Sequence, residues 1–201
     1  MEESKAIEMI KRIPTIIQNI ENPTDEMKLL AISKNGLVLK YIKNPTKEMQ
    51  ELAIENNVRA IQYIENPSEK VQLEAIKISY ESLRYLKSPS LNCQIVAIKN
   101  NESAIQFIKD LNETKISEFL KVNILVIKYI TKEINKVDIK EILKEVLSKE
   151  DVEEKYVRDF LHCSMIDRNS EIVPIDKIMF IHKYGSKKSK KIAVDERLKM
   201  I

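Results

Sequence analysis

Four prolines of the chain are evenly spaced, and this spacing constrains the fold more than any other feature of the sequence. Each follows the previous one by 22 residues: Pro23, Pro45, Pro67 and Pro89. Two other columns keep the same step, an alanine column and an aromatic column: Ala31, Ala53, Ala75, Ala97, and Tyr41, Tyr63, Tyr85, Phe107, Tyr129. Several columns in one phase indicate tandem repeats that stack on their neighbours.

Each repeat contains the signals of two helices. The asparagine before the proline (Asn22, Asn44, Asn66) is predicted to be the N-cap of a first helix, with the proline at its first position. We expect that helix to run for about 12 residues. It should end at a column in which asparagine adopts the left-handed conformation: Asn35, Asn57, Ser79, Asn101, Asn123. A second helix of about seven residues, such as 59–65, completes the unit.

The prediction is therefore an all-α fold, a right-handed α-solenoid of 22-residue two-helix repeats with a C-terminal helical subdomain. Only two glycines occur in the chain, which argues against a β-rich fold and against a glycine-rich phosphate loop. The apolar columns must be buried between units, because helices this short are marginal in water on their own.

The regular array has less regular segments on both sides. Residues 1–21 match the unit only at Ile10, Ile17 and Ile20, so they are predicted to form a capping unit whose second helix begins at Pro14. Residues 22–131 are predicted to hold five repeats, the last with Phe119 in the alanine column. Residues 132–201 are predicted to form the C-terminal subdomain, with amphipathic helices in 138–149 and 150–165, a loop over 167–174, another helix over 175–184 and a last helix after Gly185.

The phrases "NPTKEMQELAI", "NPSEKVQLEAI" and "IQYIENPSE" resemble the short tandem helical repeats of bacterial and bacteriophage proteins. Those repeats are distantly related to HEAT-type and leucine-rich-repeat-variant solenoids. The resemblance covers about residues 15–131 and is specific for architecture. It implies an α-solenoid and no catalytic residues.

Two polar columns are candidates for contact with a partner. The aromatic column and the residues beside it combine tyrosine with lysine, arginine and glutamine, which suits protein recognition. The predicted partner-binding residues are Lys40, Tyr41, Gln62, Tyr63, Arg84, Tyr85, Gln106 and Lys128. The glutamine column (Gln50, Gln72, Gln94) lies on the inward side of the first helix, so we expect these side chains to be buried or half-buried and hydrogen-bonded to an asparagine of an adjacent turn.

The C-terminal run "KYGSKKSKKIAVDERLKM" is rich in lysine. Lys187, Lys188, Lys190 and Lys191 are possible phosphate-binding residues, which gives nucleic-acid binding as the alternative function. A solvated helix face is the competing interpretation. The net charge of +3 neither indicates nor excludes a strongly charged partner.

The sequence gives little support for a catalytic site. His162 and Cys163 are adjacent, so on a helix their side chains diverge by about 100°, which is poor geometry for a nucleophile and its base. His182 is a candidate base only if the fold brings it close. Cys93 and Cys163 are predicted to be free buried thiols, and no metal or cofactor site is predicted.

A signal peptide and a membrane-spanning segment are not expected, so a cytoplasmic location is predicted. The sequence thus favours a non-enzymatic protein-binding module. The resemblance to repeats of bacteriophage proteins implies one concrete version, an adaptor or inhibitor encoded by a phage or mobile element and acting on a host or defence protein.

Overall fold

The computed structural model describes residues 2–132 and 137–199. Residues 2–132 alternate ten-residue α-helices with six-residue 3-10 helices. The α-helices are α1 (Glu3–Arg12), α2 (Asp25–Lys34), α3 (Lys47–Asn56), α4 (Glu69–Ile78), α5 (Leu91–Asn100) and α6 (Glu113–Val122). The 3-10 helices are η1 (Pro14–Asn19), η2 (Gly36–Tyr41), η3 (Val58–Tyr63), η4 (Tyr80–Tyr85), η5 (Glu102–Phe107) and η6 (Ile124–Tyr129). The all-α class is confirmed, and η1 begins at Pro14 as predicted.

The N-caps of the α-helices lie two residues beyond the predicted asparagines. The Oγ1 of Thr24 accepts from the backbone N–H of Met27, and Thr46 does the same for Met49, both at 3.3 Å. Ser68 caps α4 through the Val71 N–H. The prediction of asparagine caps was therefore wrong: Asn22 and Asn44 have positive φ, 52° and 50°, and turn the chain before the proline.

The second asparagine column ends the α-helices but not in the predicted conformation. Asn35 and Asn57 are C-caps with extended backbones, at φ −156° and −152°. Their side chains then accept from an N–H two residues on, at Leu37 and Arg59, and so cap the following 3-10 helix. One residue thus ends one helix and begins the next, and the left-handed conformation occurs instead at Asn22 and Asn44 of the other asparagine column.

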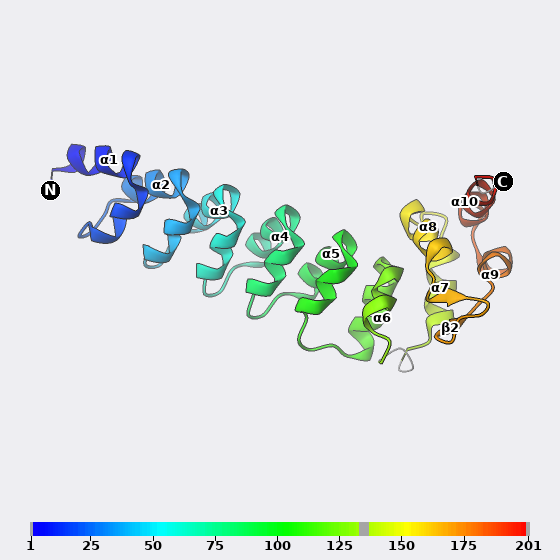
Figure 1. Ribbon diagram of the computed structural model, residues 1–201. Coiled ribbons are helices and arrows are strands. Elements are labelled where there is room, and N and C mark those ends of the chain that lie inside the picture. Colours follow the sequence, from blue (N-terminus) through cyan, green and yellow to red (C-terminus); the bar gives the residue numbers. More distant parts are fainter. Residues whose placement is uncertain (1, 133–136, 200–201) are drawn as a thin grey trace. The chain divides into compact units, whose positions relative to one another are not determined.

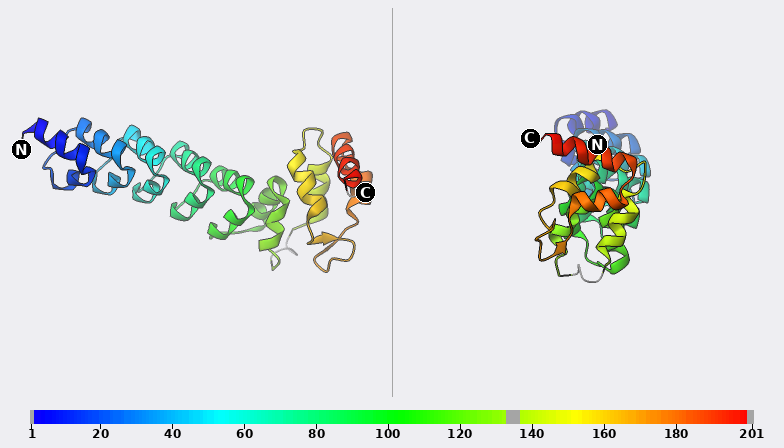
Figure 2. Two further views of the ribbon diagram at one scale, coloured as in Figure 1. Left: turned by 45° about the horizontal axis from the view of Figure 1, so that its top comes forward. Right: turned by 90° about the vertical axis from the view of Figure 1, so that its right-hand side faces the viewer.

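The chain divides into two compact units, Met1–Ala97 and Ile98–Ile201, with the division inside α5. In the first unit, α1 to α4 lie side by side in sequence order and each contacts the next (Figures 1 and 2). The 3-10 helices η1 to η4 form a parallel row of contacts. The alanine and isoleucine columns are the core of this unit: Ala31, Ala53, Ala75, Ala97 and Ile32, Ile54, Ile76 are at most 1% exposed.

Polar side chains join successive repeats of the first unit. Asn56 Oδ1 accepts from the Gly36 N–H at 2.6 Å, and Asn56 Nδ2 donates to the Ser33 carbonyl at 3.0 Å. Gly36 lies so close to this neighbour that a Cβ there would overlap the Ala53 carbonyl oxygen. The close approach of two backbones therefore requires glycine at position 36.

The second unit contains η5, α6, η6 and four further α-helices: α7 (Ile139–Leu147), α8 (Glu154–His162), α9 (Lys177–Tyr184) and α10 (Lys187–Leu198). Of these, α8 contacts η6, α9 and α10. The core includes Phe119, which is fully buried, and Phe160, whose ring lies 6.2 Å from that of Phe180. The predicted helices are confirmed, while the predicted loop 167–174 includes part of a short parallel pair, β1 (Ile166–Asp167) with β2 (Val173–Pro174).

A right-handed solenoid running through both units stays a prediction, as do the predicted domain boundaries at residues 21 and 131.

Candidate functional site

The predicted partner-binding residues lie at the ends of the 3-10 helices. In the first unit, η2, η3 and η4 contact one another in order, so their last residues form a row. Lys40, Gln62 and Arg84 are exposed. The tyrosine that follows each of them is half-buried in η2 and η4 and 38% exposed at Tyr63. We call the six residues Lys40, Tyr41, Gln62, Tyr63, Arg84 and Tyr85 the short-helix ridge.

Side chains of the ridge contact one another within a repeat, and Tyr63 of the next repeat acts electrostatically on Lys40. The Lys40 ammonium lies 4.6 Å from the centroid of the Tyr41 ring, within cation–π distance. Its pKa is raised, chiefly by hydrogen bonding to Tyr41, with a smaller electrostatic contribution from Tyr63 of the next repeat. Gln62 donates through Nε2 to the Arg59 carbonyl, at 3.0 Å, within its own helix. Lys40 therefore packs on an aromatic ring and Gln62 is bonded to its own helix, while both side chains remain exposed to solvent.

Gln106 and Lys128, the other two predicted residues, belong to the second unit. Both are exposed, at the ends of η5 and η6, which contact each other. Lys128 forms an ion pair of 3.4 Å with Glu102. These two side chains are thus accessible on an equivalent edge of their own unit.

The glutamine column has a structural role. Gln72 and Gln94 are buried and Gln50 is half-buried, as predicted, but their partner is not an asparagine. Each Nε2 donates at 3.0 Å to the carbonyl of the proline five residues earlier. The Gln72 Oε1 also accepts from the Ser90 N–H of the next repeat, so this side chain fixes the turn between two units.

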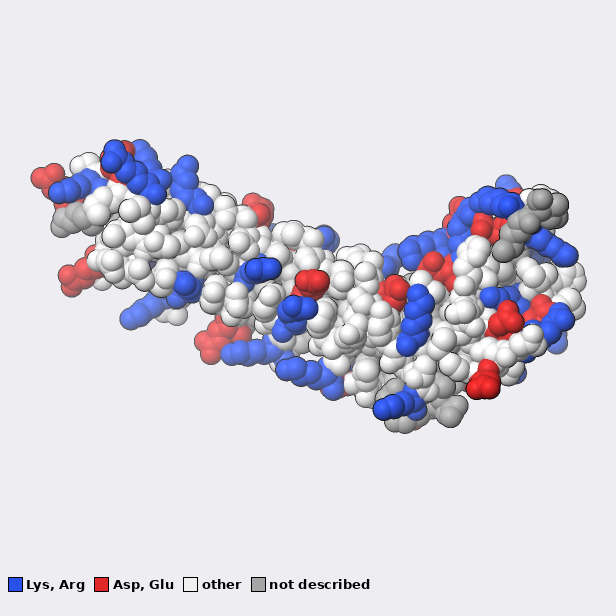
Figure 3. Space-filling view, in the orientation of Figure 1, with Lys and Arg blue, Asp and Glu red and all other residues white. Residues whose placement is uncertain are grey.

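The lysine-rich segment forms the first half of α10. Ser186 caps the helix by accepting from the Ser189 N–H, and Ser189 is fully buried, so the seryl face points inward. Lys187, Lys188, Lys190 and Lys191 are all exposed, and their ammonium groups form no ion pair with a residue of the described ranges. Figure 3 shows Lys and Arg side chains near α8 and α10, interspersed with Asp and Glu.

The cysteines and histidines form no catalytic pair in the structure. Cys163 is buried and its carbonyl accepts from Lys177, while the His162 imidazole turns to Glu196, at 2.9 Å. Burial raises the pKa of the Cys93 thiol, which opposes thiolate formation. Within residues 2–132 and 137–199, no three His, Cys, Asp or Glu side chains are close enough together to hold a metal ion.

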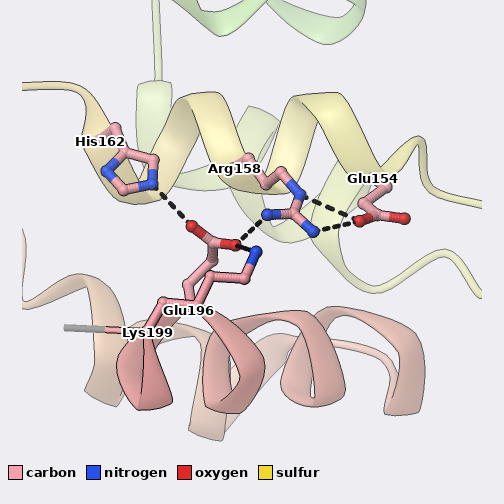
Figure 4. A network of polar contacts seen from close by, with 5 residues as sticks. All are labelled: Glu154, Arg158, His162, Glu196 and Lys199. Carbon is pink, nitrogen blue, oxygen red and sulfur yellow. Dashed lines mark hydrogen bonds and ion pairs between the residues drawn. The ribbon is translucent and has the colours of Figure 1, made fainter. Parts of the chain in front are cut away.

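A charged network that sequence reasoning missed connects α8 to α10 (Figure 4). The Glu196 carboxylate accepts from Arg158, from His162 and from Lys199, and Arg158 also pairs with Glu154. Hydrogen bonds from Lys199 and His162, together with the charge of Arg158, lower the pKa of Glu196 to about 2. The residues of α8 and those near the end of α10 are 34 (His162 to Glu196) to 45 (Glu154 to Lys199) positions apart in the sequence, so only the packing of α8 on α10 brings them together.

None of the helices in the described ranges has the length and apolar character needed to cross a bilayer. Comparison of the chain with protein-family models, with curated proteins and with solved structures gave no match.

Proposed function

We propose that this chain is a non-enzymatic protein-binding module that recognises a partner protein through the short-helix ridge. One observation carries the proposal: three adjacent 3-10 helices present tyrosine next to lysine, glutamine or arginine at the same place. Tyrosine and arginine are enriched among residues that dominate binding energy at protein interfaces. Repetition of one such edge gives an extended surface, which is the usual binding surface of a repeat protein.

The role of adaptor or inhibitor fits this surface, because the ridge has no nucleophile and no paired acid and base. The resemblance to repeats of bacterial and bacteriophage proteins adds a concrete version, in which a phage or mobile element encodes the chain and its partner is a host or defence protein. A cytoplasmic location belongs to the same proposal.

Site-specific photo-crosslinking in cells of the source organism tests the proposal. A benzophenone amino acid replaces Gln62 on the ridge, and in a matched protein it replaces Glu55, an exposed residue of α3 in the same repeat. We expect a discrete protein adduct from position 62 that is absent from position 55 and is competed by the unlabelled chain. Equal adducts from both positions, or none from position 62, would contradict the proposal.

Nucleic-acid binding is the second candidate, favoured by the four exposed lysines at the start of α10, whose ammonium groups form no ion pair with a carboxylate of the described ranges. Each phosphate contact contributes about 0.9 to the slope of log K against log salt on duplex DNA. Anisotropy titrations of DNA and RNA at two salt concentrations, with the parent chain and with Lys187→Glu/Lys188→Glu, test it. Loss of affinity and of slope in the variant would support this function, and no binding at low salt would eliminate it.

A further inference from the structure

The helices α9 and α10 enclose a groove on the surface of the second unit. Two hollows of about 530 Å³ and about 160 Å³ share three lining residues, Ile178, Ala193 and Arg197, so they are parts of one depression. In α9 the lining residues Ile178, Ile181 and His182 follow helical spacing. In α10 the spacing of Lys190, Ala193, Val194 and Arg197 is also that of one helix face. We call this depression the α9–α10 groove.

The groove and its margins expose an unusual amount of apolar side chain. Ile178 is 41% exposed, Met179 62%, Val194 58% and Leu198 65%. Val194 and Leu198 are four residues apart and so lie on the same side of α10. Clustered large apolar side chains in contact with water mark interaction sites more often than scattered ones do. Packing within the second unit leaves this apolar surface uncovered by any described residue.

Only positive charges of the groove are free to pair with a ligand. Its two carboxylates are already engaged: Asp176 caps α9 and pairs with Arg168, and Glu196 is held by Arg158, His162 and Lys199. Lys190 and Arg197, in contrast, form no ion pair within the described parts of the chain. An occupant therefore meets an apolar floor with two cations that lack partners.

We propose that the α9–α10 groove binds an amphipathic segment of a partner protein, in which apolar side chains at helical spacing are flanked by carboxylates. Apolar anchors would fill the hollows beside Ile178 and Val194, while the carboxylates would pair with Lys190 and Arg197. A helix laid into a groove between two helices is a recurrent mode of peptide recognition. The phosphate backbone of a nucleic acid would use the cations but gain nothing from Met179, Val194 and Leu198.

This inference goes beyond the proposed function, because it concerns another unit, another surface and a partner of defined chemistry. Failure of partner binding at the short-helix ridge would therefore leave this inference unaffected, and the reverse also holds.

Peptide selection with the full chain tests the inference. A phage-displayed library of random 14-residue peptides is selected on the parent protein, and the enriched peptides are synthesised with a fluorescent label. We expect enriched sequences with leucine, isoleucine or phenylalanine three or four residues apart and with an excess of aspartate and glutamate. Anisotropy then measures their affinity for the parent and for variants.

Two variants and one matched control locate the binding. Lys190→Glu/Arg197→Glu and Val194→Ser should each weaken peptide binding at least tenfold. Lys188→Glu changes an exposed lysine on the far side of α10 by the same charge, and it should alter affinity less than twofold. Unchanged circular dichroism establishes that the variants remain folded.

Three results would overturn the inference. The first is a selection that enriches no sequence, or enriches basic ones. The second is peptide binding that Lys188→Glu weakens as much as Lys190→Glu/Arg197→Glu does. The third is that duplex DNA, or vesicles of phosphatidylcholine with 20% phosphatidylserine, displace the peptides while binding more tightly to the same surface.

Discussion

The first unit and the α7–α10 part of the second unit are stabilised by contacts of different range. In the first unit the same bonds recur in successive repeats: a hydroxyl caps the α-helix at Thr24, Thr46 and Ser68, and Gln50 and Gln72 donate to the proline carbonyl five residues earlier. In α7–α10 the local helix caps are joined by long-range bonds that have no equivalent in the repeats. Ser189 donates to the Leu147 carbonyl at 2.7 Å, and the Tyr156 hydroxyl donates to the Leu120 carbonyl at 2.9 Å.

This difference determines which candidate binding surfaces can be predicted from the sequence. In the repeats, equivalent positions can be compared, so a residue that differs from its column is easily recognised. Equivalent exposed residues of successive repeats also form one continuous surface. In α7–α10 no equivalent position exists, so a groove or a charged network is visible only once the helices have packed. Four predictions test this contrast, from the largest expected effect to the smallest.

The largest effect is expected where the second unit departs from the alanine column. Phe119 is fully buried at the position that alanine occupies in four earlier repeats. Phe119→Ala should lower the free energy of unfolding by about 4 kcal/mol, because it leaves a large cavity. Urea unfolding followed by circular dichroism measures the loss. Leu111→Ala, at a residue 36% exposed, is the control and should cost far less. A loss below about 1 kcal/mol at Phe119 would mean that the site collapses on itself.

Gly36 tests how closely two repeats approach. Gly36→Ala should destabilise the chain by about 2 kcal/mol, since the added methyl group overlaps the Ala53 carbonyl oxygen and one backbone must move. At the equivalent position of the next repeat, Val58→Ala should cost about 1 kcal/mol through lost burial alone. Unchanged stability of Gly36→Ala in thermal unfolding would show that the repeats are further apart than described here.

Thr46 tests the assignment of the helix cap. Thr46→Ala should cost about 1 kcal/mol, because it leaves the Met49 N–H without its side-chain acceptor. Lys47→Ala, one residue on, should be nearly neutral. If the asparagine before the proline were the cap, Thr46→Ala would also be neutral. That result would contradict the assignment of the hydroxyl residues as the N-caps of the repeats.

The smallest effect is a pH dependence specific to the second unit. The folded chain lowers the pKa of Glu196 to about 2 from an ordinary value of 4.5, so its interactions stabilise the fold fully above pH 4.5. That contribution is lost as the pH falls from 4.5 towards 2. Glu196→Gln should therefore reduce the fall in melting temperature over this range, while Glu171→Gln, at an exposed residue of the same unit, should retain the parent profile. Identical profiles for all three proteins would show that the Glu196 network does not stabilise the fold.

Periodicity predicted the helices of the repeats because the residues of one column occupy the same packing environment in each repeat. The buried Ala31 and Ile32 columns and the start of η1 at Pro14 followed directly. The roles of the two asparagine columns were exchanged, since asparagine suits both a cap and a left-handed turn. The hydroxyl residues at 24, 46, 68 and 90 were the signal that could have decided between them, because they keep the 22-residue step.

The α9–α10 groove and the Glu196 network could not be predicted in the same way. Ile178 and Val194 are 16 residues apart and belong to different helices, and an apolar residue on an amphipathic helix is expected to be buried. Their exposure follows from how the helices of this unit pack, which the local sequence does not specify. Likewise, nothing in the local sequence of Glu196 distinguishes it from a solvated glutamate.

The affinity of the crosslinked partner for two variants of the chain is the most direct test of the central claim, that the short-helix ridge binds a protein. Isothermal titration with the purified partner compares Tyr63→Ala with Glu55→Ala in the same repeat. The account predicts that Tyr63→Ala weakens binding about tenfold or more, as loss of an interface hot spot does, and that Glu55→Ala leaves it within a factor of two. Equal affinities of the two variants would contradict the claim.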